Sequence, residues 1–382
     1  MDNNAPFARA IRRTFSAAPS KGYGTKPEPP KGSGLVYGVK MSRLGPRLQS
    51  VSAAALAVLS ACSGGITTAV PFQATSGWGR TASGSESPSS VRSFLRLPLA
   101  DTGPSRMAPG AVAQDLLYVA NSTTVTVYSY PSGKLLGTLK HFYAPQGECV
   151  DTIGDVFVTN FGTGQIFEYK HGGTKRIETL KSPTAGPIGC SVDSTTGNLA
   201  VSAFGGIVAI YKHARGKPTR YTDPRIAKFY WCAYDSVGDL FVDGQDSSSG
   251  FRFAELPKGS RAFTDITLNQ PIGWPAGVQW QGDRVLVGDQ NTPVIYEFKI
   301  SGKSGSKVGR TPLGSRAEFF KQFWVEKQTL ILPNEYVTGK ASKLETHFET
   351  LYFKYPAGGK AAKAIRGAMR FPAAAVVSAA TR

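Results

Sequence analysis

Polar side chains recur where short apolar runs begin or end, and they are the residues of this chain that could do chemistry. These carboxylates and amides are Asn121, Glu148, Asn160, Asp243, Asp289 and Asn334. Oxygen ligands of this kind hold Ca²⁺, and a bound Ca²⁺ would polarise a lactone or ester for attack by water. Asn and Asp also favour turns, because their side chains bond to their own backbone. The pattern therefore leaves open a calcium-dependent hydrolase and a structural role.

Three cysteines lie within similar apolar runs. Cys149 lies two residues before an aspartate, whereas Cys190 and Cys232 lie three residues before theirs, so Cys149 should face the opposite side of its sheet. Only Cys149 and Cys190 could then share one layer. Stacked sheets lie about 10 Å apart and a disulfide needs Cα atoms within about 7 Å, so we expect three buried thiols and no bridge. No histidine accompanies them at the spacing of a metal site.

A repeat positions these residues. Gly147-Glu-Cys-Val-Asp151 recurs as Gly189-Cys-Ser-Val-Asp193, as Trp231-Cys-Ala-Tyr-Asp235 and more loosely as Gly277-Val-Gln-Trp-Gln281, at intervals of 42 to 46 residues. Each copy continues with a β-rich run and an aromatic strand that leads into a Gly-Lys hairpin. Repeats of about 40 to 45 residues with four short strands are typical of β-propeller blades, which bury their apolar faces against one another. We predict an all-β, six-bladed β-propeller over residues 106–380.

The repeat resembles a known family. Pro145-Gln-Gly-Glu-Cys-Val-Asp151, Gly154-Asp-Val-Phe-Val-Thr-Asn160 and Gly164-Gln-Ile-Phe-Glu-Tyr169 are similar to the NHL repeat, and the array is similar to six-bladed propellers that include gluconolactonase-like proteins. The resemblance implies a fold that hosts enzymes, scaffolds and binding modules alike. The chain departs from the gluconolactonase pattern, because Gln146-Gly-Glu148 stands where an early Glu-Gly-Pro belongs. It also has no Gly-x-Ser-x-Gly nucleophile turn.

One apolar segment is left over after the sixth repeat. Phe371–Ser378 reads as a further inner strand that would complete the sheet begun near 109–121 and so clasp the two ends of the propeller. A disordered tail is the alternative. Closing the ring in this way would leave no exposed sheet end.

The residues before the repeats resemble an export signal. Residues 1–40 lack periodicity and are expected to be a disordered lead or a misassigned start, with translation beginning at Met41. Residues 41–61 have a basic start and a short apolar run, and Leu59-Ser-Ala-Cys62 resembles the lipobox of bacterial lipoproteins. The resemblance implies that Cys62 is acylated and that its lipid anchors the protein. Residues 62–105, rich in Ser, Gly and Pro, would be a flexible tether.

The net charge of the chain bears on which classes of partner it could bind. The net charge is +18, yet no nucleic-acid recognition motif accompanies it, so we expect no nucleic-acid partner. Lysines at hairpins would keep outer strands from pairing with other molecules. An extracytoplasmic binder of anionic polymers would require these basic hairpins to gather on one face. They are Lys134, Lys217, Lys303 and Lys360.

These observations predict a monomeric bacterial envelope lipoprotein whose propeller is a non-catalytic binding or scaffolding module. Its protein or small-molecule partner would bind across the channel mouth, aided by the exposed aromatic residues Phe161, Trp231 and Trp274. The alternative is a calcium-dependent lactonase or esterase at the same mouth. The two readings differ in whether several carboxylates converge there.

Overall fold

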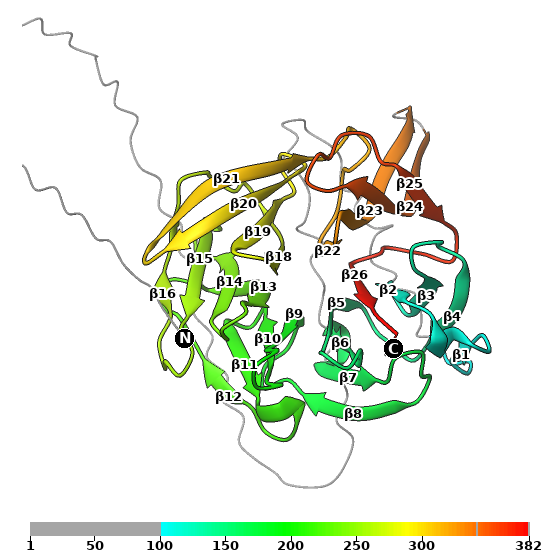
Figure 1. Cartoon of the computed structure of the whole chain (residues 1–382), viewed down its shortest axis with the longest axis horizontal. Helices are drawn as coiled ribbons and strands as arrows, with labels where there is room; N and C mark the ends of the chain where they lie inside the picture. Colours follow the sequence, from blue (N-terminus) through cyan, green and yellow to red (C-terminus); the bar gives the residue numbers. More distant parts are fainter. Residues whose placement is uncertain (1–100, 341–342, 381–382) are drawn as a thin grey trace, which may run out of the picture. The chain divides into compact units, whose positions relative to one another are not determined.

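Six β-sheets arranged around a common centre form the folded part of the chain (Figure 1). The structure, a computed structural model, describes residues 101–340 and 343–380. The predicted all-β, six-bladed propeller is confirmed, and its first strand begins at Arg106. The lead, the signal peptide with Cys62 and nearly all of the tether lie outside the described residues. Within the described residues, no helix is long and apolar enough to cross a membrane.

Each sheet is one blade, with a strand of each near the centre and the others following outward. From the centre outward, the strands of the first three blades are β26 (Ala374–Ser378), β2 (Leu116–Ala120), β3 (Val125–Ser129), β4 (Leu135–Leu139) and β1 (Arg106–Met107); β5 (Pro145–Val150), β6 (Val156–Asn160), β7 (Gln165–Tyr169) and β8 (Arg176–Lys181); and β9 (Pro187–Val192), β10 (Leu199–Ala203), β11 (Ile207–Tyr211) and β12 (Thr219–Tyr221).

The other three blades follow the same plan. Their strands, again from the centre outward, are β13 (Lys228–Tyr234), β14 (Leu240–Gln245), β15 (Phe251–Leu256) and β16 (Thr264–Asp265); β18 (Pro275–Gln281), β19 (Arg284–Asp289), β20 (Val294–Ser301), β21 (Ser304–Pro312) and β17 (Thr267–Leu268); and β22 (Trp324–Glu326), β23 (Thr329–Lys340), β24 (Lys343–Lys354) and β25 (Lys363–Arg366). Short 3-10 turns are η2 (Ala111–Ala113), η3 (Phe161–Thr163) and η4 (Lys212–Ala214).

Alternation along the strands sends neighbouring side chains into different blade interfaces. On β6, Val158 packs against the first blade with Tyr118, whereas Phe157 packs against the third blade with Leu199. Every residue of β6 is buried, because both faces of the sheet are covered by neighbouring blades. Six apolar clusters, one for each pair of adjacent blades, make up the core.

The last strand closes the ring. β26 pairs antiparallel with β2, with Val376 opposite Tyr118, so the predicted clasp is confirmed and the predicted alternative of a disordered tail is wrong for residues 374–378. The hydroxyl of Ser378 donates to the Gly154 carbonyl at 2.7 Å and lies 2.6 Å from His171 Nδ1. Ser378 therefore joins the closing strand of the first blade to two turns of the second.

Removing this hydroxyl should weaken the closure. We expect Ser378→Ala to lower the free energy of unfolding by about 1–2 kcal/mol, because it leaves the buried Gly154 carbonyl and the His171 ring without this partner. Urea unfolding followed by tryptophan fluorescence measures the change. Ser306→Ala, at an exposed position on β21, is the control and should change stability by less than about 0.5 kcal/mol. Equal losses in both variants would contradict the role given to Ser378.

A disulfide joins the second and third blades, and the prediction of three free thiols is wrong. Cys149 and Cys190 are bonded, with Cα atoms 5.7 Å apart, and Cys232 is free and buried. The predicted orientation is right, since Cys149 and Cys190 share one interface and Cys232 faces another. The assumed spacing failed because blades converge toward the centre. A Cβ built on Gly147 would lie 2.1 Å from the Ile188 carbonyl oxygen, so adjacent inner strands touch there.

Candidate functional site

The predicted site lies where the loops leading into the inner strands meet the turns after the second strands; we call this side of the propeller the mouth face. Three of the residues predicted to bind a ligand or metal instead hold the loops of this face in place. Their side-chain oxygens accept a backbone N–H from the loop that leads into the inner strand of the same blade: Asn160 from Tyr143 at 2.7 Å, Asp289 from Trp274 at 3.1 Å, and Asn334 from Glu318 at 3.0 Å. The turn chemistry that the sequence left open therefore accounts for these side chains.

Asp243 occupies a different register from these three. The expectation that it shares the slot of Asn160 is wrong by one residue, and its counterparts on the neighbouring blades are Thr159 and Ser202. Each counterpart accepts an N–H from its own inner strand and donates its hydroxyl to the next blade: Thr159 to the Ile188 carbonyl at 2.6 Å, and Ser202 to the Tyr230 carbonyl at 2.7 Å.

In the fourth blade a carboxyl group replaces the hydroxyl. Asp243 Oδ1 accepts the Trp231 N–H at 2.7 Å, and Oδ2 is buried without a hydrogen-bond partner among the described residues. Burial raises the pKa of Asp243 well above its usual range. Among the described residues, Asp243 therefore makes no bond to the next blade of the kind that Thr159 and Ser202 make.

Glu148 is also buried rather than open to the mouth. It lies on β5 opposite Val158, whose side chain belongs to the apolar cluster between the first and second blades. The residue has no exposed surface, and neither carboxyl oxygen has a hydrogen-bond partner among the described residues. Burial raises its pKa well above the usual range. Glu148 and Asp243 therefore do not converge, since they lie at different interfaces.

The loop before β22 reaches the inner strand of the second blade. The Gln322 amide accepts the Glu148 N–H at 2.9 Å and donates to the Glu148 carbonyl at 2.6 Å, as a strand would. Lys321 Nζ donates to Gln146 Oε1 at 3.0 Å, and burial lowers the pKa of Lys321 to about 8. The sixth blade is thereby joined to the second beside the closing strand. No sequence pattern predicts this contact, because neither residue belongs to the repeat.

The metal site stays a prediction. Within residues 101–340 and 343–380, no group of three or more His, Cys, Asp or Glu side chains is arranged to hold a metal ion. Asn160, Asp289 and Asn334 each already accept a backbone N–H. No described feature of the mouth face favours calcium-assisted hydrolysis.

Aromatic side chains are the main apolar feature of the mouth face. Phe161 and Trp274 are partly exposed, whereas Trp231 is 2% exposed, so the expectation that Trp231 is exposed is wrong. Its side chain lies in the apolar cluster between the fourth and fifth blades. Sequence reasoning missed other aromatic residues, which lie in the loops before inner strands and are 36–39% exposed: Tyr143, Phe319 and Phe371.

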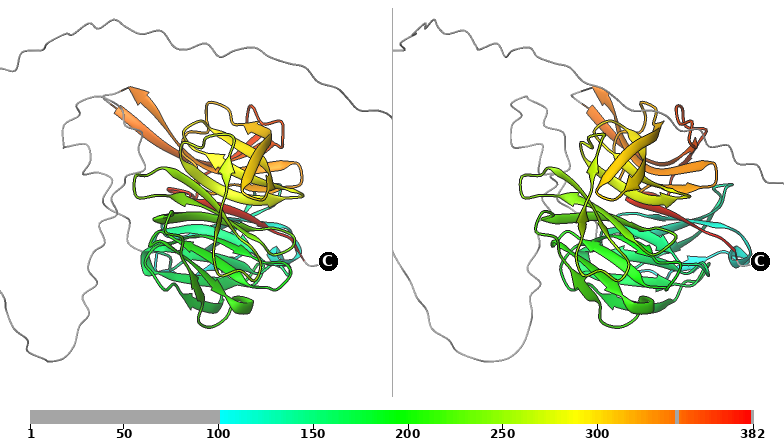
Figure 2. Two further views of the ribbon diagram at one scale, coloured as in Figure 1. Left: turned by 90° about the vertical axis from the view of Figure 1, so that its left-hand side faces the viewer. Right: turned by 60° about the vertical axis from the view of Figure 1, so that its left-hand side comes forward.

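A long hairpin adds to this face. β23 and β24 pair over twelve positions, and their shared end, beyond Asn334, extends past the blade; Figure 2 shows this hairpin in orange, projecting on one side of the propeller. Its base is ordered by stacking of Tyr336 on His347 at 4.9 Å and by Arg316, which lies 4.8 Å from the Tyr336 ring. Leu344, near its tip, is 64% exposed. The hairpin therefore presents Leu344, beside charged residues, away from the core.

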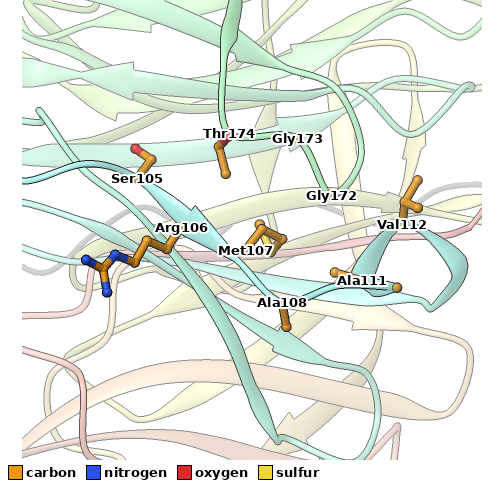
Figure 3. Close-up of a pocket in the computed structure, with 10 residues that line it drawn as sticks. Ser105, Arg106, Met107, Ala108, Ala111, Val112, Gly172, Gly173 and Thr174 are labelled. Carbon is orange, nitrogen blue, oxygen red and sulfur yellow. The ribbon is translucent and has the colours of Figure 1, made fainter.

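Two surface cavities lie at the periphery, along β1. The first, of about 620 Å³, is bounded by Met107, Val112 and the turn at Gly172–Thr174, and in Figure 3 the Arg106 side chain points away from the other labelled residues. The second, of about 510 Å³, lies between Arg106 and Lys140. Neither contains a carboxylate or a nucleophile suited to catalysis, so these cavities supply no catalytic site.

Comparisons with known proteins identify the fold of the chain. No protein-family profile and no curated protein matches the chain. Among solved structures, it is similar to a chain from a nidogen/laminin complex, with a TM-score of 0.56 and 10% identity over 70% of this chain and 100% of that one. It is also similar to a protein of unknown function from Bacteroides caccae, with a TM-score of 0.53 and 10% identity over 69% of this chain and 99% of that one. At this identity the likeness shows that the chain has the six-bladed β-propeller fold.

Proposed function

We propose that the protein is a membrane-tethered extracytoplasmic lipoprotein whose propeller is a non-catalytic module that binds a partner protein through its mouth face. One observation carries the proposal: aromatic side chains are exposed around this face, while its polar side chains are already bonded to the backbone. Exposed aromatic residues gathered on one face favour association, because they bury a large apolar area at little entropic cost. Phe319 and Phe371 are the most exposed contributors together with Tyr143.

The disulfide supports the proposed compartment. Disulfides form and persist in oxidising environments outside the cytosol. The Cys149–Cys190 bridge therefore agrees with export, to which the lipobox resemblance at Cys62 independently points. Acylation at Cys62 and a flexible tether would hold the propeller at the surface of a membrane while leaving the mouth face accessible.

A protein partner fits the surface better than a small molecule. The projecting β23–β24 hairpin offers an extended ridge on the mouth face. Broad, shallow surfaces with aromatic anchors are typical of protein interfaces. The similar propeller-sized chain from the nidogen/laminin structure comes from a complex between proteins.

Site-specific photocrosslinking in the native host tests this proposal. We expect a photoreactive residue at Phe319, Phe371 or Leu344 to give a covalent adduct with one discrete protein. The same residue at Ile177 or Val308, which are exposed on the outer strands β8 and β21, should give none. Adducts of equal yield from both sets, or none from the first set, would contradict a partner site on the mouth face.

A further inference from the structure

The outer hairpins, which join the third and fourth strands, all lie on the face opposite the mouth. In four blades the hairpin bonds to the turn at the start of the second strand or between the first two strands, which is the end remote from the mouth. These bonds are Tyr130 N–H to the Asp115 carbonyl (2.8 Å), His213 N–H to Asn198 Oδ1 (3.0 Å), Lys258 N–H to Asp239 Oδ1 (2.6 Å) and Tyr355 N–H to the Gln328 carbonyl (2.9 Å).

The remaining two blades follow the same rule. His171, in the hairpin of the second blade, lies 3.0 Å from the Gln114 carbonyl beside β2, and Lys299, next to the hairpin of the fifth blade, pairs with Asp283 at 3.7 Å in the β18–β19 turn. An anionic partner would require the basic hairpins to gather on one face. The structure meets this requirement.

Every blade places an exposed lysine in its outer hairpin. We call this surface the lysine face and define it by these residues: Lys134, Lys175, Lys217, Lys258, Lys303 and Lys360. Among the described residues, none of the six forms an ion pair. The hairpins themselves, from 130–134 round to 355–360, contain no Asp or Glu.

Two acids of this face are held by their own turns, whereas Asp239 accepts the Lys258 N–H and Asp283 pairs with Lys299. Asp151 Oδ1 accepts the N–H groups of Ile153 and Asp155, and Asp235 Oδ1 accepts three N–H groups of the β13–β14 turn. Since these carboxylates belong to tight turns, they cannot swing outward to neutralise the hairpins. The outer ring of the face therefore stays cationic.

We propose that the lysine face lies against the anionic headgroups of a lipid bilayer. Cations near an anionic leaflet are attracted additively, so six sites on one face act together. A ring of hairpins around the propeller axis meets a plane at several points at once, whereas a linear polyanion would contact only adjacent blades. A single lipid chain binds marginally, and a basic patch is the second signal that makes binding stable.

This inference goes beyond the proposed function and does not depend on it. It requires neither acylation of Cys62 nor a partner at the mouth face. If it is right, the membrane covers the lysine face and the mouth face points away, toward a partner.

Vesicle binding by the full chain tests the inference. The chain carries Cys62→Ser so that no lipid contributes, and it is sedimented with vesicles of phosphatidylglycerol and phosphatidylcholine or of phosphatidylcholine alone. We expect binding to the anionic vesicles only, weakening with salt. A variant lacking four lysines of the lysine face should partition at least tenfold less: Lys134→Gln, Lys217→Gln, Lys303→Gln and Lys360→Gln.

A matched variant removes four exposed cations from the mouth side, leaving the net charge of the two variants equal: Lys181→Gln, Lys340→Gln, Lys343→Gln and Arg370→Gln. Its partition should stay within about twofold of the parent chain, which shares the same basic N-terminal residues. Equal losses in the two variants would show that net charge alone drives binding and would overturn the inference. Unchanged binding by the lysine-face variant, or a loss confined to binding of soluble polyphosphate, would also overturn it. The photocrosslinking experiment tests the proposed partner site on the mouth face independently of vesicle binding.

Discussion

Replacing the disulfide by alanines, Cys149→Ala with Cys190→Ala, should lower the free energy of unfolding by about 4 kcal/mol. The bridge spans 41 residues of sequence, and closing a loop of that length removes about this much conformational entropy from the unfolded chain. Dithiothreitol should destabilise the parent protein by a similar amount and leave the double variant unchanged. Urea unfolding, with and without reductant, measures both effects.

Cys232 provides the control for loss of a buried sulfur atom. It occupies the equivalent inner strand of the fourth blade, is free, and burial raises its pKa to about 12, so it stays a thiol. Cys232→Ala should cost about 1 kcal/mol and should not respond to reductant. If it cost as much as the double variant, or if reductant left the parent unchanged, the bridge would not be the source of the stability.

Glu148→Gln should make the protein more stable than the parent above neutral pH, by about 1.4 kcal/mol for each pH unit over which only the folded carboxyl keeps its proton. Burial raises the pKa of Glu148 in the folded protein above its ordinary value of 4.5. The folded state therefore holds a proton that the unfolded chain has lost, and the stability of the parent falls as the pH rises above about 4.5. Glutamine cannot ionise, so the variant lacks this contribution to the fall.

The comparison needs two pH values and one control. At pH 5 the parent and Glu148→Gln should differ little, and at pH 8.5 the variant should be the more stable, as measured by urea unfolding. Glu345→Gln, which removes an exposed carboxylate from the projecting hairpin, should track the parent at both pH values. A Glu148→Gln variant less stable than the parent at pH 8.5 would show that the carboxylate is ionised and paired.

The same variants test the calcium hypothesis. The sequence suggested Glu148 and Asp243 as ligands, and a melting temperature that rises with calcium in the parent but not in Glu148→Gln with Asp243→Asn would establish a metal site. The structure places these two carboxyls at different blade interfaces, and both are fully buried. We expect no calcium-dependent shift in either protein.

The fold could be predicted because the repeat is a local sequence pattern that occurs several times in this chain. Runs such as Val156–Asn160 and Leu240–Gly244 show the strand, and the turn residues show its ends. The closing strand was predictable for a similar reason, since Ala374–Ser378 is apolar and has no other partner within the sixth repeat.

The details of the site depend on distances between blades, which no local pattern encodes. The disulfide was missed because the inner strands converge, as the contact of Gly147 with Ile188 shows. Asp243 was misplaced because a sequence does not state which residue of a strand lies opposite a bulge. The projecting hairpin could not be predicted, because residues 335–348 depart from the repeat and no local pattern marks strands longer than those of an ordinary blade.

The closing strand also constrains how the protein can be made. β26 is the last strand of the chain, yet it is the central strand of the first blade, and β2 beside it is among the first to be synthesised. During synthesis or secretion the inner edge of β2 stays unpaired, and the first sheet stays incomplete, until residue 378 has emerged. Ring closure therefore follows the synthesis of the other blades, and a chain that lacks β26 would expose that edge to other molecules.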